Sequence, residues 1–136
     1  MALSLVADAN VEGHLNYLIN RIAAGEYGEY WDLLGVRVID LADLGLGPES
    51  PDVEVWRACQ REQAVLITAN RNRDGEDSLD ATIRREGDLT SLPVLTLGDP
   101  DRLRHSPEYA DRVIARLVLI MDEIEAHRGA GRLYLP

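Results

Sequence analysis

The sequence contains no phenylalanine, and only 5% of its residues are aromatic, so aliphatic side chains must fill most of the core. It has a single cysteine, Cys59, which excludes an intramolecular disulfide and is typical of a protein from the reducing cytoplasm. The longest apolar run, Leu117 to Met121, is far too short to span a membrane. The amino-terminal segment has no basic stretch and is interrupted by Asp8, unlike a signal peptide or membrane anchor. We therefore expect a cytoplasmic protein without a membrane contact.

Positive charge is also scarce. The chain has 14 basic and 24 acidic residues, and its formal net charge of −10 argues against binding nucleic acid mainly through the phosphates. A bound cation would locally invert the sign of an acidic site and weaken this objection. The three histidines, His14, His105 and His127, show no metal-ligand spacing, so zinc is not indicated.

At 136 residues with 46% hydrophobic content, the chain predicts one globular domain, residues 1–136. Short apolar runs without alternation are typical of strands buried on both faces of a parallel sheet. Four such strands are predicted, at Leu3 to Ala7, Val36 to Leu41, Ala64 to Thr68 and Val94 to Leu97. The tail, Gly131 to Pro136, would either add an edge strand or pack across a dimer.

Helices are predicted between the strands from their periodicity and capping signals. The first would run from an Asn10 cap to Gly25, and the second from about Asp52 to Glu62, with Ser50 as N-cap and Pro51 as first residue. The third would run from an Asp77 or Ser78 cap through Arg85, and the last from Pro107, capped by Ser106, until Gly129. Glu26 to Leu34 fits a short helix. This order predicts a three-layer α/β sandwich with a mainly parallel sheet.

Ligands of open parallel sheets bind outside the carboxyl ends of the strands. Asp8 follows the first predicted strand, and Asp52 begins the second predicted helix. The third strand is followed by a segment rich in oxygen donors, namely Asn70, Asn72, Asp74, Glu76 and Asp77. Carboxylate and amide oxygens suit a hard divalent cation, so the sequence predicts a Mg²⁺ or Mn²⁺ site at this edge.

A cation held in this way can activate a water molecule and stabilise charge on a phosphoryl group, which indicates phosphodiester hydrolysis. Asp8 would be the principal ligand, Asp52 a second ligand or a water-orienting base, and Asp74 or Asp77 the remaining acid. Asp52 is preferred to Glu54 because it shares a helix face with the apolar Val55 and Trp56. Arg71 and Arg73 are candidate phosphate contacts, and Asn10 is a further candidate binding residue. Each acid also has a structural interpretation as a helix cap or a partner of the helix dipole.

Three short motifs, LVADAN at Asp8, SPDVEVWRA from Ser50 and VLITAN from Val65, resemble the PIN-like domain superfamily. The resemblance covers about the first two thirds of the chain, estimated from motif positions. It implies a Rossmann-like α/β/α sandwich and a Mg²⁺- or Mn²⁺-dependent ribonuclease, often a toxin paired with an antitoxin protein. By position, the first family aspartate falls on Asp8, the acid at the helix start on Asp52, and the third aspartate on Asn70.

Asn70 departs from the family pattern, because relatives usually carry aspartate after the strand threonine. An amide can donate an oxygen to a cation but brings no charge, and Asp74 or Asp77 would have to replace the missing carboxylate. The alternative hypothesis is a non-catalytic PIN-like module that binds a partner protein or a nucleotide. Such a module would dimerise through the last helix and the tail, with an apolar surface around Leu119, Trp31 and Tyr134.

Overall fold

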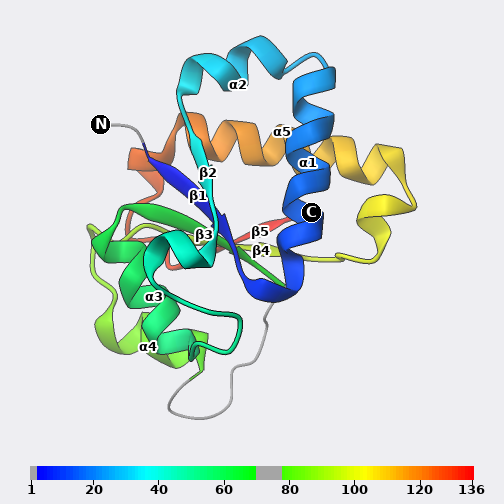
Figure 1. Ribbon diagram of the computed structural model, residues 1–136. Coiled ribbons are helices and arrows are strands. Elements are labelled where there is room, and N and C mark those ends of the chain that lie inside the picture. Colours follow the sequence, from blue (N-terminus) through cyan, green and yellow to red (C-terminus); the bar gives the residue numbers. More distant parts are fainter. Residues whose placement is uncertain (1–2, 70–77) are drawn as a thin grey trace.

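A computed structural model describes residues 3–69 and 78–136 as a five-stranded sheet flanked by helices (Figure 1). All strand pairs are parallel, and the strand order is β2-β1-β3-β4-β5. The strands are β1 (Ser4–Ala7), β2 (Arg37–Ile39), β3 (Ala64–Thr68), β4 (Val94–Leu97) and β5 (Arg132–Leu135). The helices are α1 (Glu12–Ala24), α2 (Gly28–Leu34), α3 (Asp52–Arg61), α4 (Leu79–Glu86) and α5 (Pro107–Asp122). The predicted α/β fold class is therefore confirmed.

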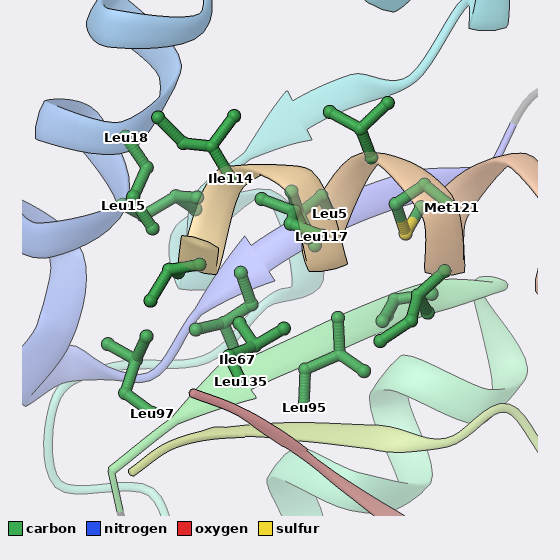
Figure 2. Packing of buried hydrophobic residues seen from close by; sticks show 14 of the residues in the cluster. Leu5, Leu15, Leu18, Ile67, Leu95, Leu97, Ile114, Leu117, Met121 and Leu135 are labelled. Carbon is green, nitrogen blue, oxygen red and sulfur yellow. The ribbon is translucent and has the colours of Figure 1, made fainter. Parts of the chain in front are cut away.

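The sheet is covered on both faces, which gives the three predicted layers (Figure 1). Helices α1, α2 and α5 pack on one face, where Leu5, Ile67 and Leu95 contribute to a large aliphatic core (Figure 2). Helices α3 and α4 pack on the other face against a smaller cluster that contains Val6 and Leu66. No helix in the described ranges has the length and apolar character needed to cross a membrane.

The tail forms the edge strand β5, one of the two alternatives that its sequence left open. The predicted strand at Val36 to Leu41 is shorter, because Asp40 leaves the sheet and caps a 3₁₀ helix at Leu41–Leu44. The Asp40 carboxylate accepts from the Asp43 backbone N–H at 2.9 Å, and the Asp43 carboxylate accepts from the Asp40 N–H at 2.9 Å. This reciprocal capping ends the strand at Ile39.

Two predicted helix caps are wrong. Ser50 does not cap α3, since its hydroxyl accepts from the Gly47 backbone N–H at 3.0 Å and closes a preceding turn. The N-cap is Pro51, and the helix starts at Asp52. Asn10 does not cap α1, because Asp8 caps a 3₁₀ turn at Ala9–Val11 and α1 begins after it.

Of the two caps predicted for α4, Asp77 or Ser78, the structure has Ser78, whose hydroxyl accepts from the Ala81 backbone N–H. The predicted cap Ser106 is confirmed, since its hydroxyl accepts from the Tyr109 backbone N–H. The last helix ends at Asp122, earlier than predicted, and continues as a 3₁₀ turn at Ile124–His127. Acidic side chains at Asp122 and Glu123 oppose the helix dipole there and favour this termination.

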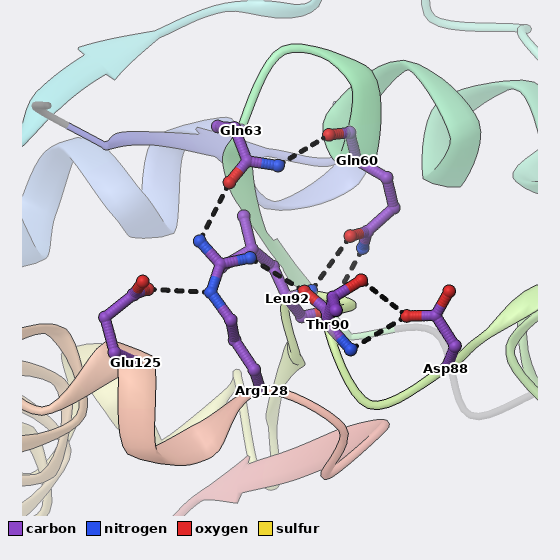
Figure 3. Close-up of polar contacts among 7 residues, drawn as sticks. All are labelled: Gln60, Gln63, Asp88, Thr90, Leu92, Glu125 and Arg128. Carbon is purple, nitrogen blue, oxygen red and sulfur yellow. Dashed lines mark hydrogen bonds and ion pairs between the residues drawn. The ribbon is translucent and has the colours of Figure 1, made fainter.

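A network of polar side chains ties the loops at the amino edge of the sheet, where the strands begin (Figure 3). Arg128 donates to the carboxylate of Glu125 at 2.7 Å, to the carbonyl oxygen of Thr90 at 2.7 Å and to the Gln63 side-chain oxygen at 2.8 Å. The Gln60 amide exchanges two hydrogen bonds with the backbone of Leu92. These contacts join the start of β3, the start of β4 and the 3₁₀ turn at Ile124–His127 that follows α5.

Candidate functional site

Asp8 lies directly after β1, at the carboxyl edge of the sheet, and its carboxylate is held from two sides. The Oδ1 atom accepts from the Ala9 backbone N–H at 2.9 Å, and Oδ2 accepts from the Thr68 hydroxyl at 3.1 Å. The Asp8 backbone N–H donates to the Ile67 carbonyl at 2.8 Å and extends the β1–β3 pairing by one residue. Asp8 is half-buried, so its carboxylate is both oriented and reachable.

Thr68 is a site residue that sequence reasoning did not select. It ends β3 and is completely buried, and its hydroxyl fixes one oxygen of Asp8. The available signal was a polar residue that closes an otherwise aliphatic strand. A hydroxyl buried at such a position needs a hydrogen-bond partner, and here the partner is the candidate ligand itself.

The strand order places Asp8 and Thr68 at a special position in the sheet. From β1 the chain continues to β2 on one side, whereas from β3 it continues to β4 on the other. The order 2-1-3-4-5 therefore changes direction between β1 and β3, and doubly wound sheets bind ligands in the crevice at this switch point. The two neighbouring strand ends at this switch point carry Asp8 and Thr68.

A second polar group lies next to Thr68, on the face of the sheet that α3 and α4 cover. Thr96 pairs with Thr68 in register and is also fully buried. Its hydroxyl accepts a hydrogen bond from Arg132, whose guanidinium also donates to Asp80 in the first turn of α4 at 2.7 and 3.0 Å. The side chains of Arg132 and Asp80 are only 10% and 18% exposed. This ion pair anchors the beginning of α4 to the two last strands.

Asp52 is the first residue of α3 and is half-buried. Because α3 follows β2, its amino terminus lies at the same edge of the sheet as Asp8. Val55 and Trp56 are buried against the sheet, whereas Glu54 is exposed. Asp52 thus lies on the inward side of the helix, as its spacing from these residues predicts.

Asn10 lies in the 3₁₀ turn that follows Asp8 and is exposed to solvent. The remaining predicted site residues, Asn70, Arg71, Arg73, Asp74 and Asp77, lie outside the described residues. Within residues 3–69 and 78–136, no three His, Cys, Asp or Glu side chains form a group that could hold a metal ion. Among the described residues, the structure therefore brings Asp8 and Thr68 into contact, and Asp52 begins a helix at the same edge of the sheet.

Cys59 is a buried residue of α3 on which the charge of Asp8 also acts. The thiol is 1% exposed, and burial together with the negative charge of Asp8 raises the pKa of Cys59 to about 12. A thiol in this environment stays protonated at neutral pH and is a poor nucleophile. Cys59 is a core residue.

The apolar surface that the sequence suggested around Leu119, Trp31 and Tyr134 is not assembled. Trp31 is only 7% exposed and belongs to the core. Leu119 is 47% exposed on α5, whereas Tyr134 pairs with Thr96 and points to the opposite face of the sheet. Dimerisation through α5 and the tail stays a prediction, and these three residues do not provide one continuous surface for it.

A scan against protein-family models and searches of curated proteins and of solved structures all found no match to this chain.

Proposed function

We propose that this protein is a phosphodiesterase that depends on Mg²⁺ or Mn²⁺, acts on RNA, and uses Asp8 as its central cation ligand. The observation that carries the proposal is the position of Asp8, a half-buried carboxylate fixed by two hydrogen bonds at the switch point of a parallel sheet. Carboxylates at such points are well placed to meet a ligand that enters the crevice.

The chemistry of the donor set fits a hard divalent cation. Each carboxylate oxygen of Asp8 accepts one of the two hydrogen bonds described above, and a carboxylate offers about four acceptor positions, so lone pairs remain for a cation. Asp8 and Asp52 would hold the ion, and Asn70 and Asp77 are the further ligands predicted from the sequence. A bound ion would supply an activated water and stabilise charge on the phosphoryl group.

The protein itself orients the carboxylate of Asp8. Thr68 and the Ala9 N–H fix the two oxygens of Asp8 before any ligand arrives, which reduces the ordering that binding requires. Asp52, at the start of α3, would act as a second ligand or would orient the attacking water.

The PIN-like resemblance supports RNA as the substrate class. Its three motifs fall at the end of β1, at the start of α3 and at the end of β3, and these elements all reach the carboxyl edge of the sheet. By the same resemblance, a toxin-like ribonuclease with an antitoxin partner protein is the proposed biological setting.

The first test is thermal unfolding with and without excess MnCl₂ for the wild type and for Asp8→Asn. At a concentration of about 100 times its dissociation constant, the cation stabilises the folded state by about 2.7 kcal/mol, which raises Tm by several degrees. The shift is expected in the wild type and is expected to vanish in Asp8→Asn. Cleavage of a labelled single-stranded RNA should fall by about a hundredfold or more in the same variant.

Asp32→Asn is the matched control, because it removes the same charge from an exposed position on α2 and should keep the full shift. Equal shifts in the wild type and both variants would mean that Mn²⁺ binds elsewhere. The absence of any shift would refute the cation site and favour the second candidate, a non-catalytic binding module. The exposed Leu33 and Leu119 on the adjacent helices α2 and α5 support that alternative.

A further inference from the structure

A pocket of about 360 Å³ lies beside the candidate site, on the side of α1. It is formed by the beginning of α1 and the connection from β4 to α5, two segments that meet at the carboxyl edge of the sheet. Its lining includes Asn10, only two residues after Asp8 in the chain, together with Gly13, His14, Asp101, Arg104 and His105. A pocket of this volume is in the range of small-molecule sites.

Arg104 is held over the start of α1. A Cβ atom on Gly13 would come within 3.0 Å of Nη2 of Arg104, so the guanidinium occupies the space that a larger residue would fill. The Cζ atom of Arg104 also lies 5.9 Å from the centre of the Tyr17 ring, within the range of a cation–π contact. Gly13 and Tyr17 together orient the guanidinium at the pocket.

Among the described residues, Arg104 has no ion-pair partner. Within the described ranges, the salt bridges involve six other arginines, and no carboxylate lies within ion-pair distance of Arg104. Asp101 lines the same pocket and, like Arg104, is exposed to solvent. The pocket thus gathers one guanidinium, two imidazoles and one amide against a single acid, in a chain whose formal net charge is −10.

We infer that this pocket binds a phosphate group of a single-stranded oligonucleotide, next to the phosphodiester that would be cleaved at Asp8. The inference rests on the proposed function for its substrate class. Arg104 is the main phosphate contact, because a guanidinium can donate two parallel hydrogen bonds to phosphate oxygens. The side chains of His14, His105 and Asn10 add further hydrogen-bond donors around the same group.

The inference explains how a strongly acidic chain can bind RNA. A cation at Asp8 would attract one phosphate, and the pocket would attract its neighbour, so two positive centres would face successive phosphates of the strand. Binding at the pocket does not require the cation. The two sites can therefore be tested separately.

The test is fluorescence anisotropy with a fluorescein-labelled hexauridylate RNA in buffer containing a metal chelator. Arg104→Gln should weaken binding about tenfold or more, since it removes a charge-assisted bidentate contact. It should also lower the slope of log K against log salt by about 0.7, the contribution of one neutralised phosphate on a single strand. Arg37→Gln is the charge-matched control, because Arg37 is exposed at the opposite edge of the sheet, and it should bind within about twofold of the wild type.

Gly13→Ala separates binding from folding. Replacing a helical glycine by alanine should stabilise the protein by about 0.5 to 1 kcal/mol, but the new Cβ would displace the Arg104 guanidinium. We expect a higher Tm together with weaker RNA binding. A variant that is merely misfolded cannot give this combination.

The inference is overturned if Arg104→Gln binds the RNA as tightly as the wild type, or if Arg37→Gln loses as much affinity. It is also overturned if Gly13→Ala binds normally. Failure of the proposed function would look different: the Mn²⁺-induced rise in Tm would be absent while the loss of RNA affinity in Arg104→Gln persisted in chelator. Conversely, an intact Mn²⁺ shift with unchanged RNA binding in Arg104→Gln would refute the pocket alone.

Discussion

Arg128 at the amino edge of the sheet and Arg104 at the carboxyl edge are the same residue type in two different settings. Arg128 donates from three nitrogens to acceptors in three separate segments, and its side chain is 21% exposed. Arg104 lies against Gly13 and a tyrosine ring and has no carboxylate partner in the part of the chain that the structure describes. The donors of Arg128 are used to join loops, whereas those of Arg104 face a pocket.

The other polar groups of the two edges also differ in whether they bond within the protein or keep positions for a ligand. At the amino edge, Gln60 and Gln63 bond to the backbone and to Arg128, so the network closes on itself (Figure 3). At the carboxyl edge, the carboxylate of Asp8 is held in place by Thr68 and retains lone pairs. The amino-edge side chains bond to one another and so contribute to stability. The Asp8 carboxylate is held in one orientation and retains acceptor positions, which suits it to binding a ligand.

Because the two arginines differ in their contacts, replacing each of them by glutamine should change the free energy of unfolding by different amounts. Arg128→Gln should lower the free energy of unfolding by about 2 kcal/mol, because it leaves the Thr90 carbonyl and the Gln63 side chain without their donor. Arg104→Gln should change it by less than about 0.5 kcal/mol, as expected for an exposed side chain without an ion pair. Urea unfolding of both variants measures the difference, and equal losses would contradict the distinction between the edges.

A second prediction compares a threonine at each edge. Thr68→Val keeps the shape of the side chain but removes the donor to the Asp8 carboxylate, and should cost about 1.5 kcal/mol. It should also reduce the rise in Tm caused by Mn²⁺, since Asp8 would be less well oriented. Thr90→Val removes a hydroxyl that donates to the exposed Asp88, and should cost less than about 0.5 kcal/mol and leave the Mn²⁺ effect intact. A full Mn²⁺ shift in Thr68→Val would show that this hydroxyl does not position the ligand.

Sequence reasoning located the elements of this fold well, because the buried strands have continuous aliphatic runs. Ala64 to Thr68 and Val94 to Leu97 are strands with the predicted bounds. The helix cap predicted at Ser50 was wrong because this side chain had two possible hydrogen-bond partners. The hydroxyl of Ser50 could cap a helix or close a turn, and it closes the turn.

Only part of the candidate site could be predicted from the sequence, because some of its residues meet through contacts between distant segments. Asp8 could be selected because an acid directly follows a buried strand. Its partner Thr68 and the pocket residues Gly13 and Arg104 depend on contacts between segments 60 and 91 residues apart in the chain. Those contacts follow from the order of the strands, and local patterns do not determine that order.

Cys59, buried in the last turn of α3, provides a smaller effect. Its pKa is raised from 9.0 to about 12, first by burial and then by the charge of Asp8. A raised pKa in the folded state means that this contribution to stability is complete below about pH 9, where the thiol is protonated in both states. It is lost as the pH rises toward 12, because the unfolded chain releases the proton first.

Between pH 9 and pH 10 the free energy of unfolding should therefore fall by about 1 kcal/mol from this residue. The measurement is urea unfolding of the wild type and of Cys59→Ala at both pH values. The alanine variant loses some packing at every pH, but the difference between the two proteins should shrink by about 1 kcal/mol at the higher value. A constant difference would mean that the thiol ionises as easily in the folded chain as in the unfolded one, and that neither burial nor Asp8 acts on it.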